Sequence, residues 1–312
     1  MAIGKTALNK NTTGSLNTAN GSSALENNTT GYDNTATGGF ALWKNTIGCD
    51  NTANGVTALA ANTTGSDNTA IGASSLRRQS YSNGGTQWLS ANVAIGNSAL
   101  YNNQPTSTSN GINNTAVGNY SLYSNITGDN NTAIGYGADV ASSGLTNATA
   151  IGANAFVNTS NTLVLGNAAN VGIGTSNAAH LLTMGGGAYC NGTNWTNASD
   201  ARLKRDINPM TNYGLSTVMQ LKPVTYYYKA DKTNHPEVGF IAQDVMKIIP
   251  EVVSGKEGDI SKGETLGLSY GNLVPVLTKA IQEQQATIEA QQKQIDELKA
   301  LVNKLIDKNK NL

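Results

Sequence analysis

Small, polar and glycine positions recur every 17 residues through the first half of the chain. Each recurrence contains a box that usually reads Asn-Thr-Ala-x-Gly. The glycines that close these boxes are Gly4, Gly21, Gly38, Gly55, Gly72, Gly96, Gly118, Gly135 and Gly152. A fixed period of this size is typical of stacked coils, each of which contacts only its neighbours. The pattern predicts a mostly β repeat rod over residues 1–165, in the form of a trimeric β-roll or a β-helix.

Each coil is expected to hold two extended segments, the box and a following Ala-Leu pair such as Ala58-Leu59. Asn- and Gly-rich turns join them, because these residues tolerate positive φ. Alternate residues of a strand face opposite sides. The column that contains Thr69 and Ile71 turns apolar in later coils, so it is predicted to face the interior. The column of Ala70 is predicted to face partner chains.

A single coil buries too little apolar surface to offset the conformational entropy of its residues. We therefore expect several chains to assemble into the rod, with three preferred. The sequence leaves open whether the coils close within one chain or interwind between chains.

The period lengthens twice, to 24 and then to 22 residues. In repeat proteins such insertions form loops on one face and often carry binding. Arg and aromatic side chains are enriched at recognition surfaces. The candidates for receptor-binding loops are Arg77, Arg78, Tyr81, Trp88 and Tyr101. The alternative is a surface bulge without a ligand.

The last forty residues keep a heptad repeat, which predicts a long coiled-coil helix over residues 273–312. Position a holds Val274, Ile281, Ile288, Ile295 and Val302. Position d holds Leu277, Gln284, Gln291, Leu298 and Leu305. Branched residues at a with Leu at d permit a dimer, and the two Gln layers complicate that assignment. The seam alone does not decide the number of chains.

Composition also divides the chain into two unlike parts. Residues 1–199 hold five basic and six acidic side chains, whereas residues 200–312 hold 15 basic and 14 acidic ones. Neither part has the charge excess that favours nucleic acid or a membrane surface, and no apolar run is long enough to span a bilayer. Two distant cysteines and two histidines form no metal signature, so no metal or cofactor is expected.

The boxes at residues 68–72 and 131–135 resemble the head repeats of trimeric autotransporter adhesins. They resemble still more closely the repeat arrays of phage tail-fibre proteins. The N-terminus lacks the basic and apolar regions of a secretory signal. The chain is therefore expected to fold in a host cytoplasm, or to be a fragment. It begins within a repeat, so an upstream tail or fibre protein is expected to dock there.

The segment Ser199-Asp-Ala-Arg-Leu-Lys-Arg-Asp-Ile resembles the start of the endosialidase-type intramolecular chaperone family. The resemblance continues through residues 239–245, 250–253 and 268–275. It implies a small α+β domain over residues 199–272 that drives homotrimer formation and then removes itself. It also implies a Ser/Lys dyad of Ser199 and Lys204 that cuts once, in cis, next to Ser199, with the Ser199–Asp200 bond favoured.

The dyad makes physical demands on this segment. A serine hydroxyl needs a base to become a nucleophile, and a lysine acts as that base only when it is neutral. Desolvation or nearby cations, here Arg202 and Arg205, favour the neutral amine. Five residues separate the pair, which matches neither one helix face nor one strand face, so the segment has to curl. Without the resemblance, Ser-Asp before a charged run indicates an ordinary cap or turn.

The expected layout is a rod (1–165), a connector (166–198), the auto-processing domain (199–272) and the helix (273–312). It predicts a virion component, a phage tail-fibre or tailspike protein, that attaches to a host-surface glycan or protein. One alternative is a bacterial surface adhesin, which the missing signal disfavours. Another is an ice-binding solenoid, suggested by the threonine column Thr18, Thr35, Thr52 and Thr69.

Overall fold

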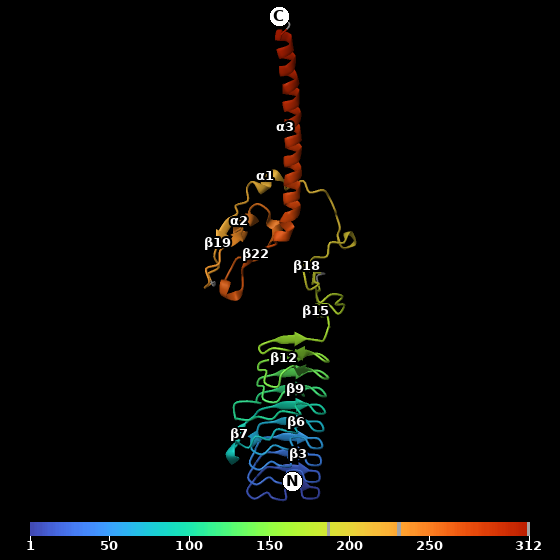
Figure 1. Ribbon diagram of the computed structural model, residues 1–312, viewed down its shortest axis with the longest axis vertical. Helices are drawn as coiled ribbons and strands as arrows, with labels where there is room; N and C mark the ends of the chain where they lie inside the picture. Colours follow the sequence, from blue (N-terminus) through green and yellow to red (C-terminus); the bar gives the residue numbers. More distant parts are fainter. Residues whose placement is uncertain (186–187, 230–231, 311–312) are drawn as a thin grey trace. The chain divides into compact units, whose positions relative to one another are not determined.

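The computed structural model describes residues 1–185, 188–229 and 232–310 (Figure 1). The last two residues of the expected C-terminal helix lie outside these ranges. The chain forms two compact units, Met1–Ser199 and Asp200–Leu312.

The first unit is built around one parallel sheet to which each coil adds a short strand (Figure 1). Within the described residues its ten strands are β1 (Ala2–Ile3), β2 (Thr18–Asn20), β3 (Thr35–Thr37), β4 (Thr52–Asn54), β6 (Thr69–Ile71), β8 (Val93–Ile95), β9 (Thr115–Val117), β10 (Thr132–Ile134), β12 (Thr149–Ile151) and β14 (Leu163–Leu165). Equivalent residues pair along the sheet, as Ala19 with Ala36 does. The sheet therefore repeats the sequence period directly.

Two smaller parallel pairs extend the coils where the repeat changes. The first insert returns to the rod through β7 (Trp88–Leu89), which pairs with β5 (Gly65–Ser66). Near the end of the rod β11 (Asp139–Val140) pairs with β13 (Phe156–Val157). The segment expected as a connector contains a four-stranded sheet of β15 (Val171–Ile173), β16 (Leu182–Met184), β17 (Tyr189–Cys190) and β18 (Trp195–Thr196).

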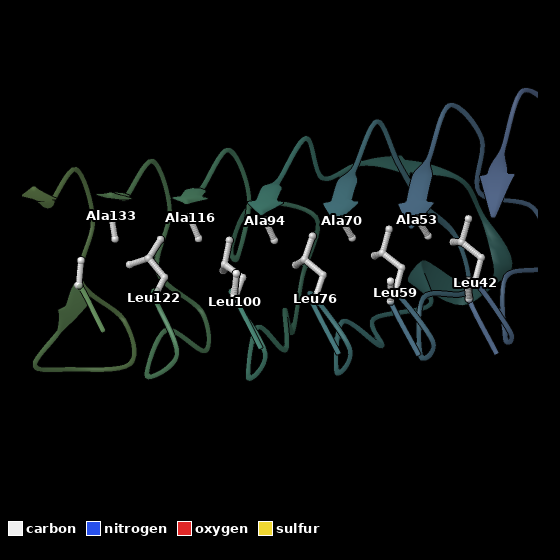
Figure 2. Packing of buried hydrophobic residues seen from close by; sticks show 14 of the residues in the cluster. Leu42, Ala53, Leu59, Ala70, Leu76, Ala94, Leu100, Ala116, Leu122 and Ala133 are labelled. Atoms are coloured by element: carbon white, nitrogen blue, oxygen red, sulfur yellow. The ribbon is translucent and has the colours of Figure 1, made fainter. Parts of the chain in front are cut away.

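The core of the rod lies inside the coils of a single chain. Figure 2 shows strand alanines facing leucines from the opposite side of each coil. The alanines are Ala19, Ala36, Ala53, Ala70, Ala94, Ala116 and Ala133, and all are fully buried. The leucines Leu25, Leu42, Leu59, Leu76, Leu100 and Leu122 are fully buried too. One chain thus forms a continuous apolar column.

The predicted orientation of the strands was wrong. Ala70 points into the coil, whereas Thr69 is half-buried and Ile71 is 39% exposed on the outer face. The reason is the width of the coil: a leucine from the far wall fills the interior, so only a methyl group fits opposite it. The later change from Thr or Asn to Ile occurs on the outer face.

The prediction of a second extended segment at the Ala-Leu pairs was also wrong for most coils. These residues lie in turns, with positive φ at Leu25 (49°), Leu42 (49°) and Leu59 (50°). This conformation costs a non-glycine residue about 1–2 kcal/mol. Burial of the leucine side chain offsets that cost, because a fully buried leucine contributes about 1.5–3 kcal/mol.

Two ladders of buried asparagine side chains run beside the apolar core. In one ladder Asn45 Nδ2 donates to Asn28 Oδ1 of the preceding coil (2.8 Å) and to the Gly48 carbonyl (2.8 Å). In the other, Asn51 Nδ2 donates to Asn34 Oδ1 (3.0 Å) and to the Gly65 carbonyl (3.0 Å). Buried polar groups need such partners. Each ladder therefore joins neighbouring coils and satisfies turn carbonyls that the core would otherwise desolvate.

Gln79 continues the first ladder across the insert. Its Nε2 donates to Asn62 Oδ1 (3.2 Å), and its Oε1 accepts from Asn92 Nδ2 (3.1 Å) and Asn103 Nδ2 (3.2 Å). The longer side chain links both ladders where the coil is interrupted. The hydrogen-bonded stacking of coils therefore continues across the 24-residue repeat.

The glycine that closes each box marks a close approach of two coils. Gly55 has a φ of +150°, and a Cβ there would collide with the Gly72 carbonyl of the next coil. A side chain at this position would force the coils apart, so the invariance of glycine within the repeat has a steric cause.

The second unit packs short elements against the start of a long helix. Its hairpins are β19 (Val224–Tyr226) with β20 (Glu237–Gly239) and β21 (Val253–Gly255) with β22 (Leu266–Leu268). Its helices are α1 (Leu215–Val218), α2 (Ala242–Met246) and α3 (Leu273–Lys310). The core contains Val245, Ile249, Val252, Leu273 and Val276.

Only the first turns of α3 belong to this core. Leu273, Val276 and Ala280 are buried, and the Glu283 carboxylate accepts a hydrogen bond from the Leu215 N–H (2.8 Å). The heptad positions beyond them are open to solvent in the single chain, as Ile281 (65% exposed) and Leu298 (62%) illustrate. The helix therefore presents an apolar seam that its own unit does not cover.

The asparagine ladders generate a first prediction. Asn51→Ala removes two donated and two accepted hydrogen bonds from a buried column, whereas Asn54 lies exposed in the same coil. Asn51→Ala is expected to lower the free energy of unfolding by about 1–3 kcal/mol for each unsatisfied group. Asn54→Ala, the matched control, should change it by less than about 0.5 kcal/mol. Denaturant unfolding of both variants checks this, and equal effects would contradict the ladder.

Candidate functional site

The Ser199–Asp200 peptide lies at the boundary between the two compact units. Directly after it the chain enters a single 3₁₀ turn (Ala201–Leu203), and Asp200 is the N-cap of this turn. The Asp200 Oδ1 atom accepts from the Arg202 N–H (2.9 Å), the usual bond of an N-cap carboxylate. The local sequence thus forms the cap and turn that its residue types favour.

Arg202 reinforces this turn through a two-pronged ion pair with Asp200. Arg202 Nη2 lies 2.6 Å from Asp200 Oδ2, and Nε lies 3.0 Å from Oδ1. The Arg202 side chain and then its backbone N–H hold the pKa of Asp200 below its ordinary value. The guanidinium of Arg205 lies 3.8 Å from the Asp206 carboxylate. Both arginines expected to act on Lys204 therefore have carboxylate partners.

Ser199 and Lys204 stand on either side of the turn. Lys204 is the residue that ends it, with extended backbone (φ −117°, ψ 151°). The 3₁₀ turn Ala201–Leu203 lies between the pair in the sequence. Both residues are exposed in the single chain. The described part of one chain therefore supplies the turn but not the desolvation that a lysine base needs.

A tyrosine and a glutamate fasten the loop that follows the turn. The Tyr213 hydroxyl donates to Glu251 Oε2 (2.6 Å), which lowers the pKa of Glu251 and raises that of Tyr213. The Tyr270 hydroxyl accepts from the Phe240 N–H (3.0 Å). The first contact connects the segment after the junction to the turn that follows α2, and the second connects the start of α2 to the turn before α3.

The rod carries a pocket of about 700 Å³ that spans regular coils and both lengthened repeats. Its walls include Phe40, Trp43, Lys44, Arg77, Arg78 and Tyr101. Three of these residues were predicted from the inserts, and the sequence reasoning missed the other three. Alignment of the repeats would have indicated two of the missed residues, because Trp43-Lys44 and Arg77-Arg78 directly follow equivalent buried leucines.

The other predicted loop residues have a different environment. Trp88 is only 5% exposed, so it does not offer a recognition surface in the single chain, contrary to its proposed place in a binding loop. Its ring packs edge-on against that of Tyr81, with centroids 5.6 Å apart. Strand β7 carries Trp88 back to the rod, and this pairing accounts for its burial. Tyr81 is half-buried.

Comparison with known proteins supplies a class for the second unit. Residues 199–254 match the family described as chaperone of endosialidase, an autoproteolytic family. This part of the chain is thus similar to that family, and the match begins at the serine of the junction.

The relatives of the chain are phage fibres. It is 40% identical over 89 residues to long tail fiber protein Gp37 of Enterobacteria phage M1, and equally to that of Enterobacteria phage Ox2. The match covers 27% of this chain and 35% of each relative, so it spans about a third of their length. No solved structure matches. Together the findings support a phage tail fibre with a C-terminal chaperone domain.

Two further findings concern membranes and metal ions. Among the described residues no helix has both the length and the apolarity to cross a bilayer. In the same ranges no three His, Cys, Asp or Glu side chains gather closely enough to hold a metal ion.

The ion pair at the junction generates a second prediction. Arg202→Gln is expected to raise the pKa of Asp200 toward its ordinary value, because the guanidinium that stabilises the carboxylate is lost. The native pKa lies below the unfolded one. The interaction therefore favours the turn above the unfolded pKa and is lost as the pH falls through the native pKa.

Carbon-13 NMR titration of the aspartate carboxyls checks this in a full chain that also carries Ser199→Ala, so that processing does not interfere. Arg205→Gln removes an equal charge beside Asp206 and serves as the control. An Asp200 pKa that moves no further with Arg202→Gln than with Arg205→Gln would refute the assignment.

Proposed function

We propose that this chain is a phage tail-fibre or tailspike component that attaches the virion to a host surface. Its C-terminal domain acts as an intramolecular chaperone that drives trimer formation and is released by self-cleavage next to Ser199. The observation that carries the proposal is a coincidence of position: the family match begins at Ser199, and the boundary between the compact units falls at the Ser199–Asp200 peptide.

Ser199 and Lys204 are proposed as nucleophile and general base. The exposed position of both residues in one chain suggests when the cut occurs. Neighbouring chains that pack around the junction would remove water and favour the neutral amine of Lys204. Cleavage would then follow assembly, and a monomer would stay whole.

The position of the cut bears on which hydroxyl attacks. Attack by Ser199 Oγ on the Ala198 carbonyl carbon closes a five-membered ring, and collapse of this ring converts the Ala198–Ser199 amide into an ester with a free Ser199 amine. Hydrolysis of the ester by water then divides the chain between Ala198 and Ser199. Attack on its own carbonyl carbon would need a four-membered ring. The favoured cut at Ser199–Asp200 therefore fits better with the Ser199 hydroxyl of a neighbouring chain, or with a water molecule that the dyad activates. The masses of the two products distinguish a cut before Ser199 from a cut after it.

The uncovered seam of α3 supports a role in assembly. Apolar side chains recur at heptad spacing along the helix, and Ile288 (50% exposed) and Ile295 (47%) have no cover from their own unit. Exposed heptads of this kind are buried when helices associate. Three chains are proposed because the chaperone family implies them, since the seam alone permits other numbers.

The outer face of the rod offers a second contact between chains. Ile71, Ile95, Ile134 and Ile151 form a column along the sheet, each between 38 and 42% exposed. Rods aligned at one level by their C-terminal units would bring these columns together. Release of the chaperone then removes the assembly device, so the stability of the fibre becomes kinetic. We place this folding in the host cytoplasm, before the fibre joins the virion.

The outward threonine column bears on the ice-binding alternative. Thr18 and Thr52 are half-buried and Thr35 is exposed, so the argument that they face inward does not hold. The other outward position of each strand, however, changes from Asn or Thr to Ile along the rod, so the outer face does not carry a regular array of threonines alone. The relatives are tail fibres, and for this reason we prefer host attachment.

The dyad generates a third prediction. Ser199→Ala and Lys204→Ala are each expected to leave a folded chain of the full 32.4 kDa, because either change removes the nucleophile or its base. Intact mass spectrometry after expression reports the result. Ser216→Ala and Lys222→Ala change exposed residues of the same types within the second unit and should be processed normally. Continued processing of Ser199→Ala would exclude Ser199 as the nucleophile.

The helical seam generates a fourth prediction. Ile288→Asp places a charge at a seam position and is expected to dissociate the oligomer, since burial of an unpaired carboxylate is strongly unfavourable. Ala286→Asp adds the same charge on the outer side of the heptad and should preserve the oligomer. Analytical ultracentrifugation gives the mass of each variant. A trimer that persists with Ile288→Asp, or a monomeric parent chain, would contradict the seam.

A further inference from the structure

The pocket on the rod arises because one coil has small side chains at a position where the coils on either side have large ones. Trp43-Lys44, Ala60-Ala61 and Arg77-Arg78 follow the buried leucines of three successive coils. Backbone hydrogen bonds join these rows, from Lys44 N–H to the Ala60 carbonyl (3.1 Å) and from Ala61 N–H to the Arg77 carbonyl (3.1 Å). The alanine pair therefore forms the floor of the pocket, and large side chains of the adjacent coils form its two walls.

The charge of the pocket is unlike that of the rest of the rod. Residues 1–199 contain five basic side chains, and three of them, Lys44, Arg77 and Arg78, line this one pocket. The six acidic side chains of the same residues are all absent from its lining. Among the described residues none of the three cations has an ion-pair partner within 4.0 Å. The local field therefore favours an anion.

Aromatic rings contact two of these cations. Lys44 Nζ lies 5.7 Å from the centre of the Trp43 ring, and Arg77 Cζ lies 5.9 Å from that of Tyr101. Arg77 Nη1 also donates to the Tyr101 hydroxyl (3.2 Å), and Tyr101 stacks on Tyr123 with centroids 5.5 Å apart. The Glu26 carboxylate, which is not part of the lining, accepts from Trp43 Nε1 (3.2 Å) and fixes that indole.

We propose that this pocket binds an anionic sugar unit of a host-surface polysaccharide. The inference rests on the proposed function and names the chemistry of the receptor. Arg77 and Arg78 bind the carboxylate or phosphate group of the sugar, since guanidinium groups favour both anions. Trp43 and Tyr101 contact the apolar face of the ring, and Lys44 adds charge at the rim. A carboxylated and a phosphorylated sugar share this chemistry.

The full chain is tested by biolayer interferometry against three immobilised probes. A glucuronate-containing hyaluronan oligosaccharide represents carboxylated sugars, phosphorylated oligomannose represents phosphorylated ones, and maltohexaose is neutral. We expect one or both anionic probes to bind and the neutral one not to bind. The affinity should fall as salt increases, because salt screens exposed charges.

Three variants locate the site. Arg77→Gln with Arg78→Gln should weaken binding at least about tenfold through lost charge-assisted hydrogen bonds. Ala61→Phe keeps every charge but fills the floor, and it should abolish binding. It suits the coil, since Lys44 and Arg78 occupy the same position in adjacent coils. The control is Lys10→Gln, which removes one basic charge outside the pocket and should bind like the parent chain.

The variants are compared only after thermal unfolding has shown that each is as stable as the parent. Binding of neither anionic probe would overturn the proposal, as would binding that survives both the Arg77/Arg78 double change and Ala61→Phe. Adsorption of the chain to a panel of enterobacterial cells is measured in parallel. Cells that adsorb the parent and the pocket variants equally refute the pocket alone, whereas cells that adsorb neither refute host attachment itself.

Discussion

The close approach of neighbouring coils is the constraint on which the rod depends. Parallel strands pair at about 4.8 Å, and here equivalent residues of successive coils pair along the sheet. This close approach excludes a side chain at Gly55 and requires polar partners for the buried turn carbonyls, whereas the leucine on the opposite wall of the coil limits the inward strand position to Ala53. The asparagine ladders provide those partners. Glycine, alanine and asparagine thus recur for three separate physical reasons within one coil, and together they define the period.

The sequence predicted the period and the stacked coils because both are visible as spacing alone. It did not predict which face of the strand lies inside. Threonine giving way to isoleucine indicated an interior face, but the alanine column is buried because Leu59 and its equivalents fill the coil from the other side. Nor did alternation foresee that Leu59 takes a positive φ, a conformation that leucine adopts only where its burial offsets the cost. The ladders escaped notice because asparagine beside glycine reads first as a turn.

The candidate functional residues could be predicted from the sequence to different degrees. The motif around Ser199 was recognisable from residue order, and the family match begins at the same serine. The ion pair between Asp200 and Arg202 could not be read from order, because it depends on how one turn folds. In the rod, Arg77, Arg78 and Tyr101 stood out within the insert, whereas Trp43 and Lys44 belong to regular coils. Alignment of the repeats by their buried leucines, rather than inspection of insertions, brings these residues together.

The central claim is that assembly of the chains precedes and enables removal of the chaperone. Native mass spectrometry of the unaltered chain, sampled while it refolds from denaturant, reports the oligomeric state and the covalent state together. The account predicts monomers that are always whole and trimers that convert from whole to divided chains at the junction. Divided monomers that appear before any trimer, or trimers that retain 32.4 kDa per chain indefinitely, would contradict it.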